Sequence, residues 1–336
     1  MVMFLAAACA VSAQARPVLV GYLPAFKGLV SKVATTPIDG YTHINIAFAN
    51  PDPSGRLVRN GRMTCMEDGA QDHVTVPQLR DAATRLRAKG AKVLLSVAGG
   101  ILPRCAGDWS ALTGAGTRDR LVKELLATVE AAGLDGIDID IEGELLTRID
   151  RQGNYTPFIA ALSNKLKARS KLLTVATASY EGGMIPVGSI PYFDLVMAMS
   201  YDAIGPSWGT PGSEHATPAQ AEHDVALWLD RGVAPERLVL GVPFYGYGFG
   251  SYPPHLDFRD LLTTYPDKAL GDDVIGKACA GCDYVSFNSV ATIRRKAALA
   301  RARAGGVMVW EITQDSDTQL LARTIASQLY ETSTPN

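Results

Sequence analysis

Three acidic side chains lie two residues apart in the stretch GLDGIDIDIEGE, residues 133–144, where the isoleucines between them indicate a buried strand. Because successive side chains of a strand point to opposite faces, Asp138, Asp140 and Glu142 share one face and the isoleucines share the other. Neighbouring acids on that face lie roughly 6–7 Å apart at Cβ. Ionising all three in a confined space costs free energy, so we expect at least one to hold a proton at neutral pH and hydrogen bonds to couple the three. A carboxyl group that keeps its proton at neutral pH can act as a general acid.

Two kinds of chemistry suit such a row of carboxyl groups, and the spacing alone does not separate them. The acids could bind Mg²⁺ or another hard cation, or Glu142 could protonate the leaving group of a glycosidic bond. A metal site in a barrel normally collects ligands from several strands. The ends of the other predicted strands are instead aromatic and uncharged, apart from one aspartate: Tyr22, Phe48, Ser96, Met199, Tyr201, Asp202 and Trp310. Flat rings suit the faces of sugars better than a hard cation, so we favour glycoside chemistry and expect neither a metal nor another cofactor.

The acids lie in one of eight apolar runs that we predict to be strands. Strands that are apolar throughout and alternate with helices imply a parallel sheet covered on both faces, and eight of them predict a single-domain α/β protein with a (β/α)8 fold, the TIM barrel. One face of a barrel strand packs on helices and the other fills the interior, so the acids must point inward, with Glu142 nearest the C-terminal mouth where active sites form. The runs are 18–23, 42–49, 92–97, 134–141, 172–178, 193–200, 237–244 and 305–312. Predicted helices between them are 76–89, 117–132, 156–169, 218–231 and 288–303.

The structural alternative is a doubly wound open sheet, which usually has a glycine-rich phosphate loop after its first strand. The residues at that place, GYLPAFKG (21–28), are not such a loop. The chain of 336 residues has a formal net charge of −2 and no basic patch, so nothing suggests nucleic acid or an anionic membrane surface as a partner. The five histidines are dispersed and form no HExxH or comparable metal motif.

The first fifteen residues, MVMFLAAACAVSAQA, indicate an export signal. An apolar run too short to span a bilayer precedes Ala13-Gln14-Ala15, an A-x-A cleavage pattern. Cys9 could instead be a lipoprotein acceptor, although the leucine before it lies one place too far upstream for a good lipobox. We therefore predict a secreted or periplasmic protein with a signal peptide at 1–15, a mature domain at 16–331 and a frayed tail at 332–336.

Signal cleavage would leave four cysteines, and an even count in an exported chain favours disulfides. The simplest of the three pairings joins Cys65 to Cys105 and Cys279 to Cys282. The C-A-G-C motif could alternatively be half a zinc site or a redox pair. No second CxxC motif completes a zinc site and no thioredoxin-like context surrounds it, so a small disulfide loop is the preferred interpretation.

The stretch DGIDIDIE (135–142) matches the DxxDxDxE signature of glycoside hydrolase family 18, the chitinase family, with Asp135 as its first acid. SVAG (96–99) resembles the family's SxGG motif, with Ser96 and Gly99 in place and Ala98 replacing the first glycine. Other segments resemble the family in order along nearly the whole mature chain: THINIAFA (42–49), MSYD (199–202), GVPFYGYGF (241–249) and GGVMVWEI (305–312). The chain is similar to a short bacterial-type form that lacks the family's large insertion after the seventh strand, since only about 35 residues fill that region.

The resemblance implies a retaining mechanism in which no second protein carboxylate attacks the sugar, an exception to the usual two-carboxylate scheme. Glu142 would protonate the glycosidic oxygen, and the substrate's own 2-acetamido oxygen would close onto C1. Asp140 would orient the acetamido group, Asp138 would be its buried partner, and Tyr201 would hydrogen-bond the acetamido carbonyl. Asp135 is expected to be structural, holding the turn before the strand. The implied substrate-binding residues are Tyr22, Phe48, Met199, Asp202 and Trp310.

Several details around this site follow from neighbouring residues. Tyr201 and Asp202 are adjacent, so both can reach the site only if a bulge or the strand end presents one of them. Family members often have an aromatic residue and a proline after the glutamate, where this chain has Gly143 and Glu144. The short insertion predicts a shallow, more endo-like cleft. Four further aromatic residues could stack on outer sugars: Trp109, Trp208, Tyr245 and Tyr247.

The sequence therefore predicts a secreted, monomeric hydrolase of β-1,4-linked N-acetylglucosamine polymers, most simply chitin, with no nucleic acid partner and no membrane span. An alternative within enzymes is an endo-β-N-acetylglucosaminidase that acts on the core of N-glycans or on a peptidoglycan-like polymer. The alternative outside enzymes is a non-catalytic chitin-binding lectin. Relatives of that kind commonly lose the acidic glutamate, whereas Glu142 is present here.

Overall fold

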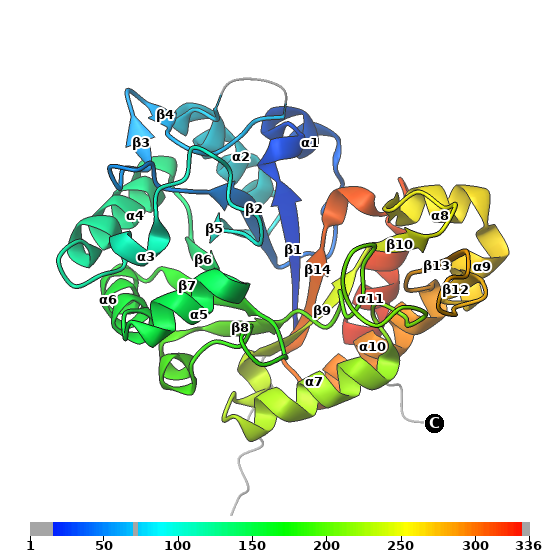
Figure 1. Cartoon of the computed structure of the whole chain (residues 1–336). Helices are drawn as coiled ribbons and strands as arrows, with labels where there is room; N and C mark the ends of the chain where they lie inside the picture. Colours follow the sequence, from blue (N-terminus) through cyan, green and yellow to red (C-terminus); the bar gives the residue numbers. More distant parts are fainter. Residues whose placement is uncertain (1–15, 70–72, 331–336) are drawn as a thin grey trace, which may run out of the picture.

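The protein is a closed parallel barrel, seen in a computed structural model that describes residues 16–69 and 73–330. Its strand order is β1-β14-β9-β8-β7-β6-β5-β2, and β1 pairs with both β14 and β2, so the sheet has no open edge (Figure 1). The predicted (β/α)8 barrel is confirmed, and the open-sheet alternative is excluded. Each predicted run overlaps one strand: β1 (Val18–Pro24), β2 (His43–Ala49), β5 (Lys92–Ala98), β6 (Gly136–Asp140), β7 (Leu172–Thr177), β8 (Leu195–Ala198), β9 (Leu238–Pro243) and β14 (Gly306–Trp310). The predicted signal peptide with Cys9, and the predicted tail, lie outside the described residues.

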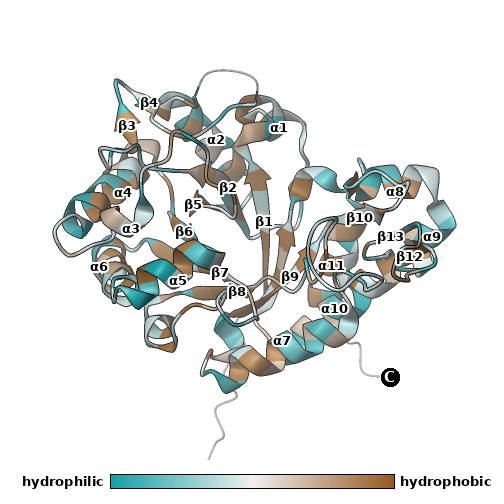
Figure 2. Cartoon of the chain, viewed as in Figure 1, coloured by the Kyte–Doolittle hydropathy of each residue, from teal (hydrophilic) through white to brown (hydrophobic). Residues whose placement is uncertain are grey.

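Helices cover the outside of the barrel, with apolar faces turned towards the strands and polar faces outward (Figure 2). The five predicted helices form as α2 (Val76–Ala88), α4 (Arg118–Ala132), α6 (Tyr155–Lys167), α7 (Pro218–Asp230) and α10 (Val290–Arg303). The remaining α-helices are α1 (Leu29–Thr35), α3 (Trp109–Leu112), α5 (Gly143–Arg151), α8 (Phe258–Thr264), α9 (Pro266–Gly271) and α11 (Leu320–Tyr330). Short 3-10 helices are η1 (Ala25–Lys27), η2 (Val187–Tyr192), η3 (Pro235–Arg237) and η4 (Ile312–Gln314).

Local sequence determines where these helices begin and end. Thr75 caps α2 by accepting a hydrogen bond from the Gln78 N–H at 3.2 Å, and the Gln78 side chain accepts one from the Thr75 N–H at 2.8 Å. At the other end of a helix, Gly133 follows α4 with a φ of 66°, a left-handed conformation that glycine adopts without a steric penalty. The chain can therefore turn from α4 directly into β6, the strand that carries the acids.

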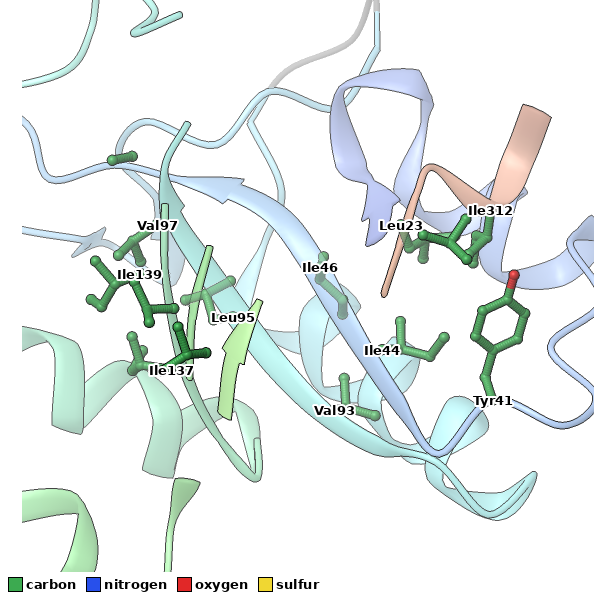
Figure 3. Close-up of a cluster of buried hydrophobic side chains, with 14 of the residues drawn as sticks. Leu23, Tyr41, Ile44, Ile46, Val93, Leu95, Val97, Ile137, Ile139 and Ile312 are labelled. Atoms are coloured by element: carbon green, nitrogen blue, oxygen red, sulfur yellow. The ribbon is translucent and has the colours of Figure 1, made fainter. Parts of the chain in front are cut away.

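The two faces of β6 meet different surroundings. Ile137 and Ile139 belong to the large apolar core between the strands and the helices, beside Leu95 of β5 (Figure 3). Asp138 and Asp140 point the other way and are 0% and 3% exposed. A smaller apolar cluster fills the barrel interior on their side, from Val20, Tyr22, Ala47, Ala176, Leu195, Met197, Val239 and Met308. The expected inward direction of the acids is thus confirmed.

The segment after β9 forms a small antiparallel sheet beside the barrel, a feature that the sequence analysis did not predict. Its strands lie in the order β11 (Leu256–Asp257), β10 (Tyr245–Phe249), β13 (Tyr284–Ser286) and β12 (Val274–Gly276), with α8 and α9 next to them (Figure 1). A second small sheet pairs β3 (Val58–Arg59) with β4 (Arg62–Met63).

Both predicted disulfides form, one between Cys65 and Cys105 and the other between Cys279 and Cys282. The first joins segments that follow β2 and β5, at the C-terminal mouth of the barrel. The second lies between β12 and β13 of the small sheet. None of the helices in the described ranges combines the length and the apolar character that a membrane crossing requires.

Candidate active site

A cavity of about 580 Å³ opens at the C-terminal mouth of the barrel. It collects eight of the residues that the sequence analysis placed in the site: Tyr22, Phe48, Asp140, Glu142, Met199, Tyr201, Asp202 and Trp310. These residues come from the ends of β1, β2, β6, β8 and β14 or directly follow them. Because parallel strands bring their carboxyl ends to the same rim, residues far apart in sequence meet around one space.

Asp138 lies beneath the cavity and is held by three hydroxyl groups. The hydroxyls of Tyr22 and Ser96 each donate to its Oδ2 at 2.7 Å, and the hydroxyl of Thr174 donates to its Oδ1 at 2.6 Å. Burial raises the pKa of Asp138, while the three hydrogen bonds lower it. The result is a buried carboxyl group whose oxygens are both satisfied, so it is fixed in position.

Asp140 and Glu142 form a coupled pair at the top of the row. Burial, and then the nearby charge of Glu142, raise the pKa of Asp140 well above its usual range. Oδ1 of Asp140 is buried and has no hydrogen-bond partner within the described residues. Burial and then the charge of Asp202 raise the pKa of Glu142 to about 7, against a smaller lowering by a hydrogen bond with Asp140. This pair can therefore hold a proton near neutral pH, as expected for a general acid.

The end of β8 presents both Tyr201 and Asp202 to the cavity. The strand stops at Ala198, and Asp202 has a φ of 61°, a left-handed conformation that aspartate tolerates better than most residues. Tyr201 and Asp202 therefore both line the cavity, because the chain has left the regular strand before it reaches them. Asp202 accepts a hydrogen bond from the hydroxyl of Tyr245 at 2.5 Å.

Tyr201 keeps its hydroxyl group available at the cavity. Burial raises its pKa well above the usual value, so it stays a neutral donor. Its hydroxyl group donates to the sulfur of Met308 at 3.8 Å, and a thioether sulfur is a weak acceptor. The hydroxyl can therefore donate to a polar group of a bound molecule.

Aromatic rings line the same cavity as the acids. Phe48 stacks on Trp310 with ring centroids 5.6 Å apart and an interplanar angle of 18°, and Tyr22 tilts against Trp310 at 5.3 Å. The Ala47–Phe48 and Trp310–Glu311 peptide bonds are cis. A flat apolar surface facing a carboxyl pair suits a sugar, whose ring faces are apolar and whose edges carry hydroxyl groups.

The remaining residues of the predicted motifs lie around this set. Gly99 has a φ of 96°, and a Cβ there would come within 2.8 Å of the Phe48 ring. Ala98 has a φ of 75°, in the region where glycine is preferred, at the place where the family motif has glycine. Asp135 lies directly before β6, where its Oδ2 accepts from the Val93 N–H at 2.8 Å and contacts Arg87 at 3.3 Å, a position that fits the expected structural role.

Two of the four residues expected at outer sugars lie elsewhere. Trp109 is fully buried and donates from Nε1 to Asn50 Oδ1 at 2.8 Å, so its assignment as an outer platform is wrong. Tyr245 is 3% exposed and bonds Asp202, so it also offers no outer face to a sugar. Trp208, which is 46% exposed, and Tyr247 line the cavity as the prediction requires.

Three contributors were missed by the sequence analysis. Thr174 lies on β7 and gives Asp138 its third hydrogen bond. Gly100 lies against Glu142, because a Cβ at this glycine would be 2.9 Å from Glu142 Oε1. Asn50 bonds both the Ala98 carbonyl and Trp109. Alternation along β7 placed Thr174 on the inner face and could have indicated it, whereas the other two contacts cross between strands and leave no local pattern.

No group of three or more His, Cys, Asp or Glu side chains in residues 16–69 and 73–330 is placed to hold a metal ion. A separate and larger cavity of about 950 Å³ is lined in part by Gly143 at the start of α5. Its lining includes Leu102, Arg148, Arg151 and Tyr180. It is more polar in residue type than the aromatic cavity above the acids.

A closed parallel barrel with a buried carboxyl pair and aromatic rings at its mouth is typical of barrel-fold glycoside hydrolases. The model of "Glycosyl hydrolases family 18" matches residues 18–315, and the chain belongs to this family. This result confirms the resemblance that the DxxDxDxE stretch indicated.

Solved structures of the family share the fold. The GH18 chitinase ChiB of Flavobacterium johnsoniae is 29% identical, with a TM-score of 0.78 and 94% of both chains covered. A GH18 chitinase from Cycas revoluta, solved in complex with (GlcNAc)3, is 21% identical with a TM-score of 0.74, covering 93% of this chain and 99% of that one, and supports the fold alone.

The relatives with known names differ in length from this chain. The chain is 25% identical to chitotriosidase-1 of Mus musculus over 82% of this chain and 67% of that protein. It is 24% identical to probable chitinase 10 of Drosophila melanogaster over 68% of this chain, but only 12% of that protein. A class V chitinase of Arabidopsis thaliana is 24% identical, with 90% of this chain and 88% of the plant protein covered. The chain thus spans very different shares of the relatives that it matches.

Proposed function

We propose that the protein hydrolyses β-1,4-linked N-acetylglucosamine polymers, with chitin as the simplest substrate. The observation that carries this proposal is the Asp140–Glu142 pair, in which the pKa of Glu142 is raised to about 7 beside an aromatic wall. The family membership and the chitinase names of the relatives support the same substrate class.

The proposed reaction uses the substrate's own acetamido group as nucleophile. Glu142 gives its proton to the glycosidic oxygen as the C1–O bond breaks, and the acetamido carbonyl oxygen bonds to C1, which produces an oxazolinium ion. Asp140 stabilises the positive charge on the acetamido nitrogen, and Tyr201 donates a hydrogen bond to the acetamido oxygen. Water then attacks C1, the bond between C1 and the acetamido oxygen breaks, and the Glu142 carboxylate accepts a proton from the water. This step restores the acetamido group and the starting state of Glu142, with retained configuration at C1.

The other residues would bind rather than react. Trp310 would form the floor under the reacting sugar, with Phe48 and Tyr22 beside it, and Asp202 and Met199 would contact its edge. Asp138 would link β6 to the neighbouring strands through its three hydroxyl partners, and its position next to Asp140 would adjust the proton affinity of that residue.

The direct test is incubation with defined chitin oligomers, followed by mass spectrometry of the products. We expect shorter N-acetylglucosamine oligomers from the wild type and none from Glu142→Gln at equal folded concentration. An N-glycan and a peptidoglycan fragment, assayed beside them, would reveal a different preferred polymer. Binding of oligomers without any product from the wild type would contradict the hydrolase and favour a lectin.

The stereochemistry tests the acetamido mechanism separately. Proton NMR of the first products should show the β-anomer before mutarotation. Initial α-products would contradict nucleophilic attack by the acetamido group while leaving hydrolysis itself intact.

We also propose that the protein acts outside the cytoplasm, as a monomer. Two disulfides suit an oxidising compartment. Fractionation of the producing cells and sedimentation of the purified protein test the two parts independently.

A further inference from the structure

His215 is a fully buried histidine behind the proposed site, and the proposed reaction does not use it. It lies between β8 and α7 and is 0% exposed. Neither ring nitrogen has a hydrogen-bond partner among the described residues. A buried polar group usually has one, so this imidazole requires an explanation.

The neighbour that explains it is Asp202. Nδ1 of His215 lies 3.7 Å from Oδ1 of Asp202, slightly longer than a hydrogen bond. That same oxygen already accepts from the hydroxyl of Tyr245. A movement of a few tenths of an ångström would give Asp202 a second donor on the side away from the cavity.

The imidazole is held in place from several directions. Its ring packs against Tyr245 and Tyr247 of β10, with centroids 5.4 and 5.3 Å away. Its backbone N–H donates to Ser286 Oγ of β13 at 3.0 Å, and its carbonyl accepts from the Ala203 N–H at 3.0 Å. The small sheet thus fixes the ring directly behind Asp202.

The surroundings favour a neutral ring. Burial is the main cause that lowers the pKa of His215, and the Lys296 charge adds to it, while Asp202 and then Asp273 oppose it. Lys296 is itself buried on α10 and donates from Nζ to the carbonyl of Ala216 at 2.9 Å. The groups that face the imidazole are therefore Asp202 from the end of β8, Lys296 from α10, Asp273 before β12, and the two phenols of β10.

We propose that His215 is a positioning residue: its imidazole donates from Nδ1 to Oδ1 of Asp202 and keeps that carboxylate oriented towards Glu142. Two donors on one oxygen, from Tyr245 and His215, hold the carboxylate in one orientation. The anion in turn opposes ionisation of Glu142, so the acid retains its proton to a higher pH. The small sheet beside the barrel thereby affects the proton affinity of Glu142, the proposed general acid, through His215 and Asp202.

The first test is the tautomer of His215 in the wild-type protein. Nitrogen-15 NMR of labelled histidines distinguishes a proton on Nδ1 from a proton on Nε2. We expect His215 to be neutral with its proton on Nδ1, and a neutral ring protonated on Nε2 would overturn the proposal.

The second test compares variants by the titration of Glu142. Carbon-13 NMR of labelled glutamates follows this group, with its signal identified by its loss in Glu142→Gln. His215→Phe fills the space without a donor and should lower the pKa of Glu142 by about half to one unit. His215→Asn places an amide donor near the position of Nδ1 and should keep the wild-type value.

Matched controls separate this effect from general disturbance. His43 is also a buried histidine, at the start of β2, so His43→Phe should leave the Glu142 titration unchanged. In an Asp202→Asn background His215→Phe should add no further shift, because the charge through which it acts is gone. An equal shift from His43→Phe, or a full shift in the Asp202→Asn background, would contradict the proposal.

The consequence for catalysis rests on the proposed function. The basic limb of the pH profile of kcat/KM should move down in His215→Phe by the shift seen in NMR, and should stay in place in His215→Asn. The two NMR measurements need no turnover. A protein that did not hydrolyse chitin would therefore leave the role of His215 testable, and an unshifted Glu142 would leave hydrolysis intact.

Discussion

Asp138 and the Asp140–Glu142 pair lie on the same face of the same chain segment, yet they meet opposite surroundings. Asp138 receives three hydroxyl donors, whereas Asp140 leaves one buried oxygen without a partner. Burial raises the pKa in both regions. Three hydrogen bonds offset it at Asp138, whereas at Asp140 the hydrogen bond with Glu142 raises the pKa further. The hydrogen bonds around Asp138 hold that side chain in position. The Asp140–Glu142 pair keeps a buried oxygen without a partner and raised pKa values, which a reaction can use. The following predictions test this division.

The largest effect is expected at Glu142. Glu142→Gln keeps the size of the side chain but removes the transferable proton, so kcat on chitin oligomers should fall by about 10³-fold or more. The adjacent Glu144→Gln should stay within about threefold, because that carboxyl group is exposed. Similar losses from both variants would remove Glu142 from its proposed role.

The pH dependence should report the same group. Since the active form of Glu142 is protonated and its pKa is raised to about 7, kcat/KM should fall as the pH rises through about 7. A profile that stays flat to pH 9 would contradict a general acid with this pKa.

Asp140→Asn should separate activity from stability. We expect a loss of kcat of about 10²-fold, because an amide cannot balance a positive acetamido group. A carboxyl group whose pKa is raised on folding destabilises the folded state at pH values above its unfolded pKa, and this penalty disappears as the pH falls below that value. Asp140→Asn should therefore raise the free energy of unfolding at pH 8 by about 1 kcal/mol or more and leave it unchanged near pH 3. Denaturant titrations at the two pH values check this, and a destabilised variant at pH 8 would contradict it.

Thr174→Val tests the hydrogen bonds around Asp138. It removes the donor to Asp138 Oδ1 and leaves a buried acceptor unpaired, which should cost about 1–3 kcal/mol of unfolding free energy. Thr128→Val is the matched control, since that buried hydroxyl bonds only the carbonyl of Glu124 in its own helix. The control should cost clearly less, and equal costs would mean that the hydroxyls around Asp138 are not special.

Gly100→Ala should have the smallest effect. The added Cβ would meet Glu142 Oε1 at 2.9 Å, so the acid must shift slightly. We expect a loss of kcat of about three- to tenfold with little change in stability. Gly116→Ala has open space around its Cβ and should match the wild type in both measurements.

The parts of this molecule whose apolar residues follow a regular spacing could be predicted from the sequence. The eight apolar runs located the barrel strands, and the alternation around Ile137 and Ile139 oriented the acids. The small sheet escaped prediction because its strands are two to five residues long and pair across long gaps, as Tyr247 does with Ser286. Short segments of this kind carry no periodic signal.

The errors at the site have a related cause. Trp109 was expected near sugars because its type suits them, but its Nε1 finds Asn50, 59 residues away. Tyr245 likewise contacts Asp202, 43 residues before it. Residue type indicated the chemistry of these side chains, while their partners depended on tertiary packing that one sequence does not display.

The bond between Cys65 and Cys105 joins two loops at the mouth of the barrel that carries the proposed site. Asn50, whose N–H donates to the Cys65 carbonyl and whose side chain holds Ala98 and Trp109, lies just after Phe48. In a chain folded in a reducing cytosol we expect the barrel strands to pair as here, because neither cysteine lies in one of them. Such a chain would lack the disulfide between the two loops. We expect it to bind substrate with full affinity only after Cys65 and Cys105 are oxidised.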